Sequence, residues 1–388
     1  MQAQCKTFVR AWLLATVAGL AGVAGFNVLV DPAGAYQGLH LRAFEPLRFL
    51  DMDRVAKAEL ARHGGWEVII LGSSRSKAGL PATHPFLVNN RTCNLSVDGA
   101  TFPELATAFD YALKHNPLKH VVLCLDLNMF SNGPGWVLDF PESRFNPGFD
   151  RFAYYCKQLL GRDSTERAWA TVRRYRQGDI PPVQARNGFY DHRLNAETSQ
   201  RELFDRVLRL MAASYRRQTL DPANLELFRH MVRECRDEKI DLQVAIMPVH
   251  ALDIELLHAC GRWPEFEKWK ADLVNVLAEE GVEGRFNLWD FTGYAGPPAE
   301  AIPAPGDAAR RMRFYFENSH CTPVLGGLML DAMFGGGGVP ACGVKLDRSN
   351  LKAHLARILE DRSAYARTNA VEVQWVRQIM TEVGAQPK

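Results

Sequence analysis

The stretch that decides the fold is Val68-Ile69-Ile70-Leu71-Gly72-Ser73-Ser74-Arg75-Ser76, in which an apolar run ends at a glycine followed by hydroxyl side chains. Four consecutive apolar residues without polar alternation indicate a strand that is buried on both faces, as in a parallel sheet. A glycine directly after such a strand permits a sharp turn. We therefore expect an α/β fold with Ser74 at the carboxyl end of the first strand.

Four further segments are also short, mostly apolar and bounded by turn-forming residues. With Trp66–Leu71 as the first strand, the others are Thr92–Val97, His120–Leu127, Leu242–Met247 and Phe286–Phe291. Helical patterns fill most of the gaps, notably Phe102–Leu113 and Phe266–Leu277. This alternation predicts a doubly wound sheet of five parallel strands with right-handed crossovers.

About 110 residues separate the third and fourth predicted strands, although a crossover needs only a dozen or so. Helical patterns occur in this interval near Arg151–Leu160, Thr165–Tyr175, Gln200–Tyr215 and Asn224–Glu238. We therefore predict a helical insertion over 131–239, inside a domain that covers 32–345. Two further helices, over 346–388, are expected to pack on that domain.

An uncharged run, Ala11–Val30, precedes the predicted domain and is twenty residues long. About 20 apolar residues are enough for a helix to cross a bilayer. Lys6 and Arg10 precede the run and no acidic residue does, so the positive-inside rule places the short N-terminal tail in the cytoplasm. Residues 1–31 are thus predicted to be a tail and membrane anchor, with the domain exported. Cleavage of a signal peptide near Val23-Ala24-Gly25 is the alternative.

The charge balance and residue spacing exclude several classes of protein. Without Lys6 and Arg10 the chain has 44 basic and 44 acidic residues, so the predicted exported part has no net formal charge. Nucleic-acid-binding proteins usually have a net basic surface, so no nucleic-acid partner is expected. Because the histidines lack HxH and HExxH spacing and the cysteines lack CxxC spacing, we also expect no metal and no cofactor.

Ser74 and His320 are the candidate nucleophile and base. A serine hydroxyl is a weak nucleophile near neutral pH, so an imidazole must take its proton and a third group must orient that imidazole. His320 ends the run Glu317-Asn318-Ser319-His320, which makes Glu317 the candidate acid. Asp290, at the end of the fifth predicted strand, is the alternative acid.

Four further residues follow the predicted strands or the candidate nucleophile. A developing oxyanion needs fixed hydrogen-bond donors, for which the candidates are the backbone N–H groups of Ser74 and Gly99 and the side-chain amide of Asn128. Arg75 either binds an anionic part of a substrate or pairs with a surface acid. His250, at the end of the fourth strand, either lines the site or only makes structural hydrogen bonds.

The order of these motifs resembles the SGNH/GDSL hydrolases. In particular it resembles the SGNH-like proteins of exopolysaccharide-acetylation systems and, more distantly, the teichoic-acid D-alanylation protein. The resemblance extends over the anchor and the Asp31-Pro32 pair after it, and over Leu71–Arg75, Asn94–Gly99, Leu125–Phe130, Met247–His250 and Phe316–Gly326. Two features depart from it: Glu317 stands where these proteins usually have aspartate, and the Gly-x-Asn-Asp block is absent around Asn128.

The resemblance implies a flavodoxin-like sheet and a membrane-anchored serine esterase or transferase. Its substrate would be an acyl group, most simply acetyl, on an envelope or exported polysaccharide. It also implies an inner (cytoplasmic) membrane location with the catalytic domain on the periplasmic or extracytoplasmic side, and a membrane-bound O-acyltransferase as a partner. The two departures leave an alternative, a catalytically inactive scaffold or glycan-binding component of a polysaccharide-modification complex.

Overall fold

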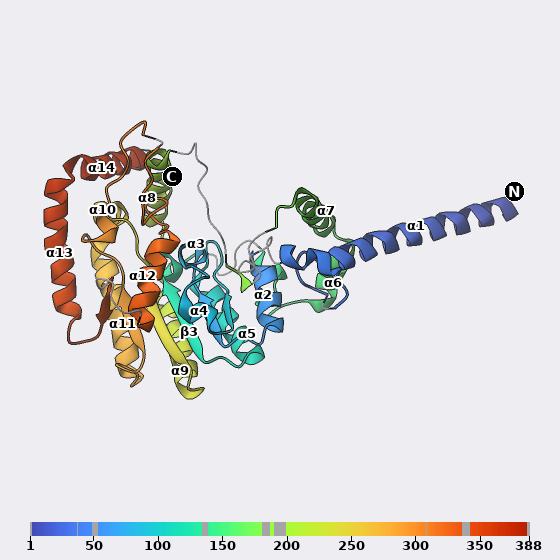
Figure 1. The fold of residues 1–388 in the computed structure, drawn as a ribbon, viewed down its shortest axis with the longest axis horizontal. Helices are drawn as coiled ribbons and strands as arrows, with labels where there is room; N and C mark the ends of the chain where they lie inside the picture. The colour runs from blue at the N-terminus through green and yellow to red at the C-terminus, as the bar shows by residue number, and fades with distance from the viewer. Residues whose placement is uncertain are drawn as a thin grey trace. The chain divides into compact units, whose positions relative to one another are not determined.

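The chain divides into two compact units in the computed structural model, which describes residues 2–36, 38–48, 53–133, 139–180, 187–189, 199–307, 309–335 and 342–385 (Figure 1). The first unit contains Met1–His63 and Leu138–Gly188, and the second contains Gly64–Val137 and Phe189–Lys388. The interval 131–239, which the sequence predicts to be one insertion, is therefore divided between the units. Residues 32–63, predicted to belong to the domain with the sheet, lie in the first unit.

The second unit is built on a six-stranded mixed sheet with the strand order β2-β1-β3-β4-β5-β6. The strands are β1 (Val68–Leu71), β2 (Thr92–Asn94), β3 (His120–Leu125), β4 (Asp241–Ile246), β5 (Asn287–Asp290) and β6 (Val344–Leu346). The first five are parallel, and β6 is antiparallel to β5. The sheet thus contains all five expected strands and one that was not expected. Only Leu346 of the three residues of β6 is buried, so this strand has no apolar run in the sequence.

The apolar run 68–71 is uninterrupted because β1 is an interior strand of the sheet. Ile69 pairs with Cys93 of β2 on one side and with Val121 of β3 on the other. All four residues of β1 are fully buried, as expected for a parallel strand covered on both faces. Cys93 and Cys124 are buried in the same sheet.

Helices of the second unit connect the strands and pack on one another. They are α3 (Ser74–Gly79), α4 (Pro85–Val88), α5 (Phe102–His115), α8 (Gln200–Tyr215), α9 (Pro222–Asp237), α10 (Ala251–Ala259), α11 (Trp263–Glu279), α12 (Pro323–Phe334), α13 (Leu351–Thr368) and α14 (Ala370–Ala385), with short 3₁₀ turns at η2 (Leu127–Phe130) and η5 (Pro297–Ala299). Helix α9 packs between α5 and α11, α12 packs on α3, and α14 packs on α8 and α10 (Figure 1). The two predicted C-terminal helices are α13 and α14.

The first unit contains the helices α1 (Gln2–Val30), α2 (Asp53–His63), α6 (Arg151–Leu160) and α7 (Arg162–Gln177), with 3₁₀ turns η1 (Arg42–Leu47) and η3 (Phe140–Glu142). Helix α1 is long and apolar enough to cross a membrane. Its C-terminal end packs on α6 and α7, while the rest extends away from them as a single helix (Figure 1). Val30 forms a small core there with Phe44 and Ala168.

A glycine is required where α12 crosses α3. A Cβ added at Gly326 would lie 1.9 Å from the carbonyl oxygen of Gly79, which is backbone and cannot turn aside. A Cβ added at the next residue, Gly327, would meet only Pro81 Cγ at 3.9 Å. Since α3 begins at Ser74 and α12 begins shortly after His320, this close contact positions both candidate residues.

We therefore predict that Gly326→Ala lowers the free energy of unfolding by about 1–3 kcal/mol, because an inserted methyl group forces the two helices apart. The matched variant Gly327→Ala should leave stability unchanged or raise it by up to about 1 kcal/mol, since alanine favours a helix over glycine. Denaturant titration of the detergent-solubilised full-length protein measures both. Equal effects of the two substitutions would contradict the close approach.

Candidate active site

The turn after β1 is fixed by hydrogen bonds from its first serine. Ser73 Oγ donates to Asp126 Oδ2 at 2.8 Å and accepts from the backbone N–H of Arg75 at 3.3 Å, so Ser73 is the N-cap of α3. A Cβ at Gly72 would lie 2.8 Å from Cys124 Cβ, which explains the glycine at this position. Ser74 is consequently the first residue of α3 and stays partly exposed.

Ser74, His320 and Glu317 form one hydrogen-bonded chain. Ser74 Oγ and His320 Nε2 are 2.7 Å apart, and His320 Nδ1 contacts Glu317 Oε1. The Glu317 carboxylate is buried, while His320 is 29% exposed. A hydroxyl on one imidazole nitrogen and a carboxylate on the other is the arrangement that activates a serine nucleophile.

The glutamate fits in place of an aspartate because its carboxylate folds back over the turn 317–320. Glu317 Oε2 accepts from the backbone N–H of Ser319 at 2.7 Å. Ser319 Oγ donates to Glu317 Oε1 at 3.2 Å and lies 3.0 Å from His320 Nδ1. These bonds hold the longer side chain beside the imidazole. We did not single out Ser319 from the sequence, although its position between the acid and the histidine was a signal for it.

The loop that carries His320 is closed on itself and tied to α10. Phe316 N–H donates to the carbonyl of His320 at 3.0 Å, and Tyr315 and Cys321 form an antiparallel bridge. Asn318 Nδ2 donates to Asp253 Oδ1 of α10 at 3.0 Å. The position of His320 therefore depends on contacts with a distant part of the sheet unit.

Arg75 pairs with an acidic residue that is buried, and not with the surface acid expected as one alternative. Its guanidinium is buried and lies 3.7 Å from Asp253 Oδ2, which also accepts from Tyr215 Oη at 2.9 Å. Burial opposes the charge, but Asp126, Tyr215 and Asp253 outweigh it and raise the pKa of Arg75. Burial raises the pKa of Asp253 to about 6. The sequence contained no signal for Asp253 or Tyr215.

His250 has a structural role. It is fully buried, Nε2 lies 2.8 Å from the Glu300 carbonyl, and Nδ1 accepts from Leu252 N–H at 3.3 Å as the N-cap of α10. Burial lowers the pKa of His250 to about 4, so the ring is neutral near pH 7. The backbone N–H of His250 donates to the carbonyl of Asn318 at 2.8 Å, which is a second hydrogen bond that holds the His320 loop.

Asp290, the alternative acid, has other partners than His320. Its carboxylate accepts from Lys270 Nζ at 2.6 Å and contacts His354 Nε2 at 2.8 Å. Burial alone would raise the pKa of Asp290, but the cationic Lys270 and the bond from His354 lower it. The carboxylate beside His320 is that of Glu317.

The oxyanion candidates Gly99 and Asn128 follow strands that flank β1. The chain after β2 reaches the nucleophile turn, because Val97 N–H donates to the carbonyl of Gly72 at 3.1 Å. Gly99 comes two residues later with a φ of +60°, a conformation that favours glycine. Asn128 lies in η2, directly after β3, and its Oδ1 is buried without a hydrogen-bond partner among the described residues.

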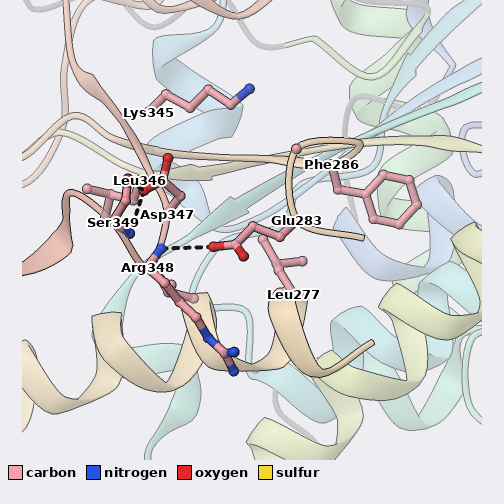
Figure 2. A pocket seen from close by; sticks show the side chains of 10 residues that line it. Leu277, Glu283, Phe286, Lys345, Leu346, Asp347, Arg348 and Ser349 are labelled. Carbon is pink, nitrogen blue, oxygen red and sulfur yellow. Dashed lines mark hydrogen bonds between the residues drawn. The ribbon is translucent and has the colours of Figure 1, made fainter. Parts of the chain in front are cut away.

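A cavity of about 350 Å³ lies beside the amino end of β5, whereas Ser74 follows the carboxyl end of β1. Its walls come from the end of α11, the turn before β5, and β6 with the residues that follow it. The backbone N–H of Arg348, just after β6, donates to Glu283 Oε1 at 2.8 Å (Figure 2). Leu346 pairs with Leu288, near the amino end of β5. Ser74 follows the carboxyl end of a parallel strand, which is the edge where open α/β sheets bind ligands. Ser74 and His320 do not line this cavity.

We predict that Asp290→Asn destabilises the protein by about 3–5 kcal/mol, because it leaves Lys270 as an unpaired buried charge. The matched variant Asp272→Asn removes the partner of Lys268, an exposed ion pair on the same helix, and should cost at most about 0.5 kcal/mol. Urea titration measures both. Because the pKa of Asp290 is lowered on folding, its contribution is present above about pH 4, so the difference from wild type should shrink as the pH falls below that. A difference that is independent of pH would contradict the ion pair.

Comparison with known proteins assigns no family: no protein-family model matches the chain, and no curated protein is significantly similar to it.

Proposed function

We propose that the chain is a membrane-anchored, SGNH-like serine esterase or transferase that moves an acyl group, most simply acetyl, on an envelope or exported polysaccharide. The observation that carries the proposal is the hydrogen-bonded chain from Ser74 through His320 to Glu317. Its geometry is that of a nucleophile, a base and an orienting acid.

The topology of the sheet supports the same proposal. The parallel strands follow the order β2-β1-β3-β4-β5, which is the doubly wound, flavodoxin-like order. In such sheets the reactive groups gather beyond the carboxyl ends of the strands. Ser74, Gly99 and Asn128 follow the ends of β1, β2 and β3 in this way.

In the proposed reaction Ser74 Oγ attacks the ester carbonyl while its proton passes to His320 Nε2. Glu317 stabilises the imidazolium that forms, through the Nδ1 proton. The N–H groups of Ser74 and Gly99 and the Asn128 amide stabilise the oxyanion. The intermediate then expels the alcohol oxygen, which takes the proton from His320, and leaves an acyl-serine. Water or a sugar hydroxyl, deprotonated by His320, attacks the acyl-serine. The second intermediate expels Ser74 Oγ, which takes that proton back from His320.

The location is the second part of the proposal. With Lys6 and Arg10 on the cytoplasmic side, α1 crosses the inner membrane and the sheet unit faces the periplasmic or extracytoplasmic space. Polysaccharides are assembled and modified there. A membrane-bound O-acyltransferase, which the resemblance to exopolysaccharide-acetylation proteins implies as a partner, is the proposed source of the acyl groups.

We predict that Ser74→Ala and His320→Ala each lower the turnover of p-nitrophenyl acetate or an acetylated polysaccharide by several orders of magnitude. The double variant should be no worse than either single one, because the two residues act as a unit. Ser363→Ala, a matched change of an exposed serine on α13, should leave turnover unchanged.

Near-full turnover by folded Ser74→Ala protein would contradict the assignment of the nucleophile. If wild-type protein turns over no acetyl ester and Ser74→Ala binds polysaccharide as tightly as wild type, the inactive scaffold replaces the enzyme as the better account.

We also predict that an alkaline phosphatase fused after residue 388 is active, because that reporter matures only in an oxidising compartment outside the cytoplasm. Replacing Lys6 and Arg10 with glutamate should lower this activity by removing the charges that orient the helix. If the wild-type fusion protein is produced at full length but its alkaline phosphatase is inactive, the proposed orientation is contradicted.

A further inference from the structure

The exposed part of α1 is shorter than its uncharged run. Residues 4–23 are exposed, whereas Ala24, Gly25 and Phe26 are partly covered and Asn27 and Val30 are buried. Lys6 and Arg10 lie in the exposed part, so the stretch both uncharged and exposed is Ala11–Val23. At about 1.5 Å per residue these thirteen residues span about 20 Å, against about 30 Å for a hydrocarbon core.

The remaining length comes from 24–30, which packs on α6 and α7. Asn27 Nδ2 donates to the carbonyl of Leu159 at 2.8 Å and to Thr165 Oγ1 at 3.0 Å. The Phe26 ring lies 5.1 Å from that of Trp169, between ring centres. If 24–30 completes the span, the corner between α6 and α7 lies at the same depth as the membrane boundary.

The surface of this corner has the composition expected there. Phe152, Cys156 and Leu160 form an exposed stripe at helical spacing along α6, with Phe152 80% exposed. Trp169 on α7 is 55% exposed, and tryptophan is enriched at membrane interfaces. Arg173, one turn further along α7, is also exposed and has no ion-pair partner among the described residues. We call these five residues the corner surface.

The other end of α1 is consistent with this placement. Trp12 is exposed and follows Arg10 closely, so an interfacial aromatic ring and a cation mark a boundary there. A span from that boundary needs Ala11–Val30 to reach about 30 Å.

We propose that the corner surface is embedded in the interfacial layer of the bilayer that α1 crosses. The first unit would then rest in the membrane, instead of being held away from it by an exposed stalk. The occupant of this surface is a phospholipid bilayer, with Arg173 toward the phosphate groups of the lipids. The inference rests on the membrane anchoring proposed above, and it is independent of the chemistry at Ser74.

The test measures the depth of single labels on the full-length protein in vesicles of phosphatidylethanolamine and phosphatidylglycerol. Fluorophores are attached at Leu13→Cys, Leu20→Cys or Leu160→Cys, with the exposed or partly exposed Cys5, Cys156, Cys260 and Cys342 changed to serine. Leu13 and Leu20 are equally exposed and seven residues apart on one face of α1. Nitroxide lipids quench the labels from a shallow or a mid-bilayer position.

If Ala11–Val30 spans the bilayer, its centre lies beside Leu20, so the mid-bilayer nitroxide should quench the label at 20 more strongly than that at 13. The label at 160 should be quenched by the shallow nitroxide, and more strongly by it than by the mid-bilayer nitroxide. If 4–23 spans instead, the centre lies beside Leu13 and the order of the two α1 labels is reversed. That reversal, or a label at 160 that neither nitroxide quenches, would overturn the inference.

If neither α1 label is quenched, the helix does not cross the membrane, and this inference falls together with the proposed anchoring. The esterase activity of the same preparation, and its loss in Ser74→Ala, then shows separately whether the proposed chemistry holds.

Discussion

The hydrogen bond between Ser74 Oγ and His320 Nε2 is the interaction on which the rest of the site depends. It joins residues that are 246 positions apart, so it forms only if two separate parts of the sheet unit are held at a fixed distance. Helix packing through Gly326 and Gly79 supplies one constraint, and the bond from Asn318 to Asp253 supplies the other. A catalytic site must hold its residues at nearly fixed distances. Here a close backbone contact between two helices and buried hydrogen bonds hold them, and both kinds of contact are rigid.

Local pattern in the sequence was enough to predict the core of the sheet. The run 68–71 is apolar because β1 is covered on both faces, and β3 and β4 carry the same signal. β6 carries no such signal, because only Leu346 of its three residues is buried. The division of 131–239 between two units could not be predicted either, since it depends on which helices pack together and not on which residues form helices.

For the candidate site too, the sequence predicts the residues with a local signal and misses those whose role depends on packing. Residue type and chain order were sufficient to select Ser74, His320 and Glu317, which the structure brings together. Arg75 remained undecided from the sequence, because only the fold shows which acids surround it. Asp253 and Tyr215 carried no local signal, since their role comes from burial beside Arg75, on helices far from it in sequence.

The measurement that tests the central claim most directly is covalent reaction with a fluorophosphonate, followed by mass mapping of the modified peptide. A phosphonate forms a stable bond only with a serine that a neighbouring base has activated, and it needs no knowledge of the natural substrate. The account predicts one adduct per chain, located on Ser74, and a strongly reduced rate of its formation in folded His320→Ala protein. Folded wild-type protein that forms no adduct, or forms it on another serine, would contradict the account.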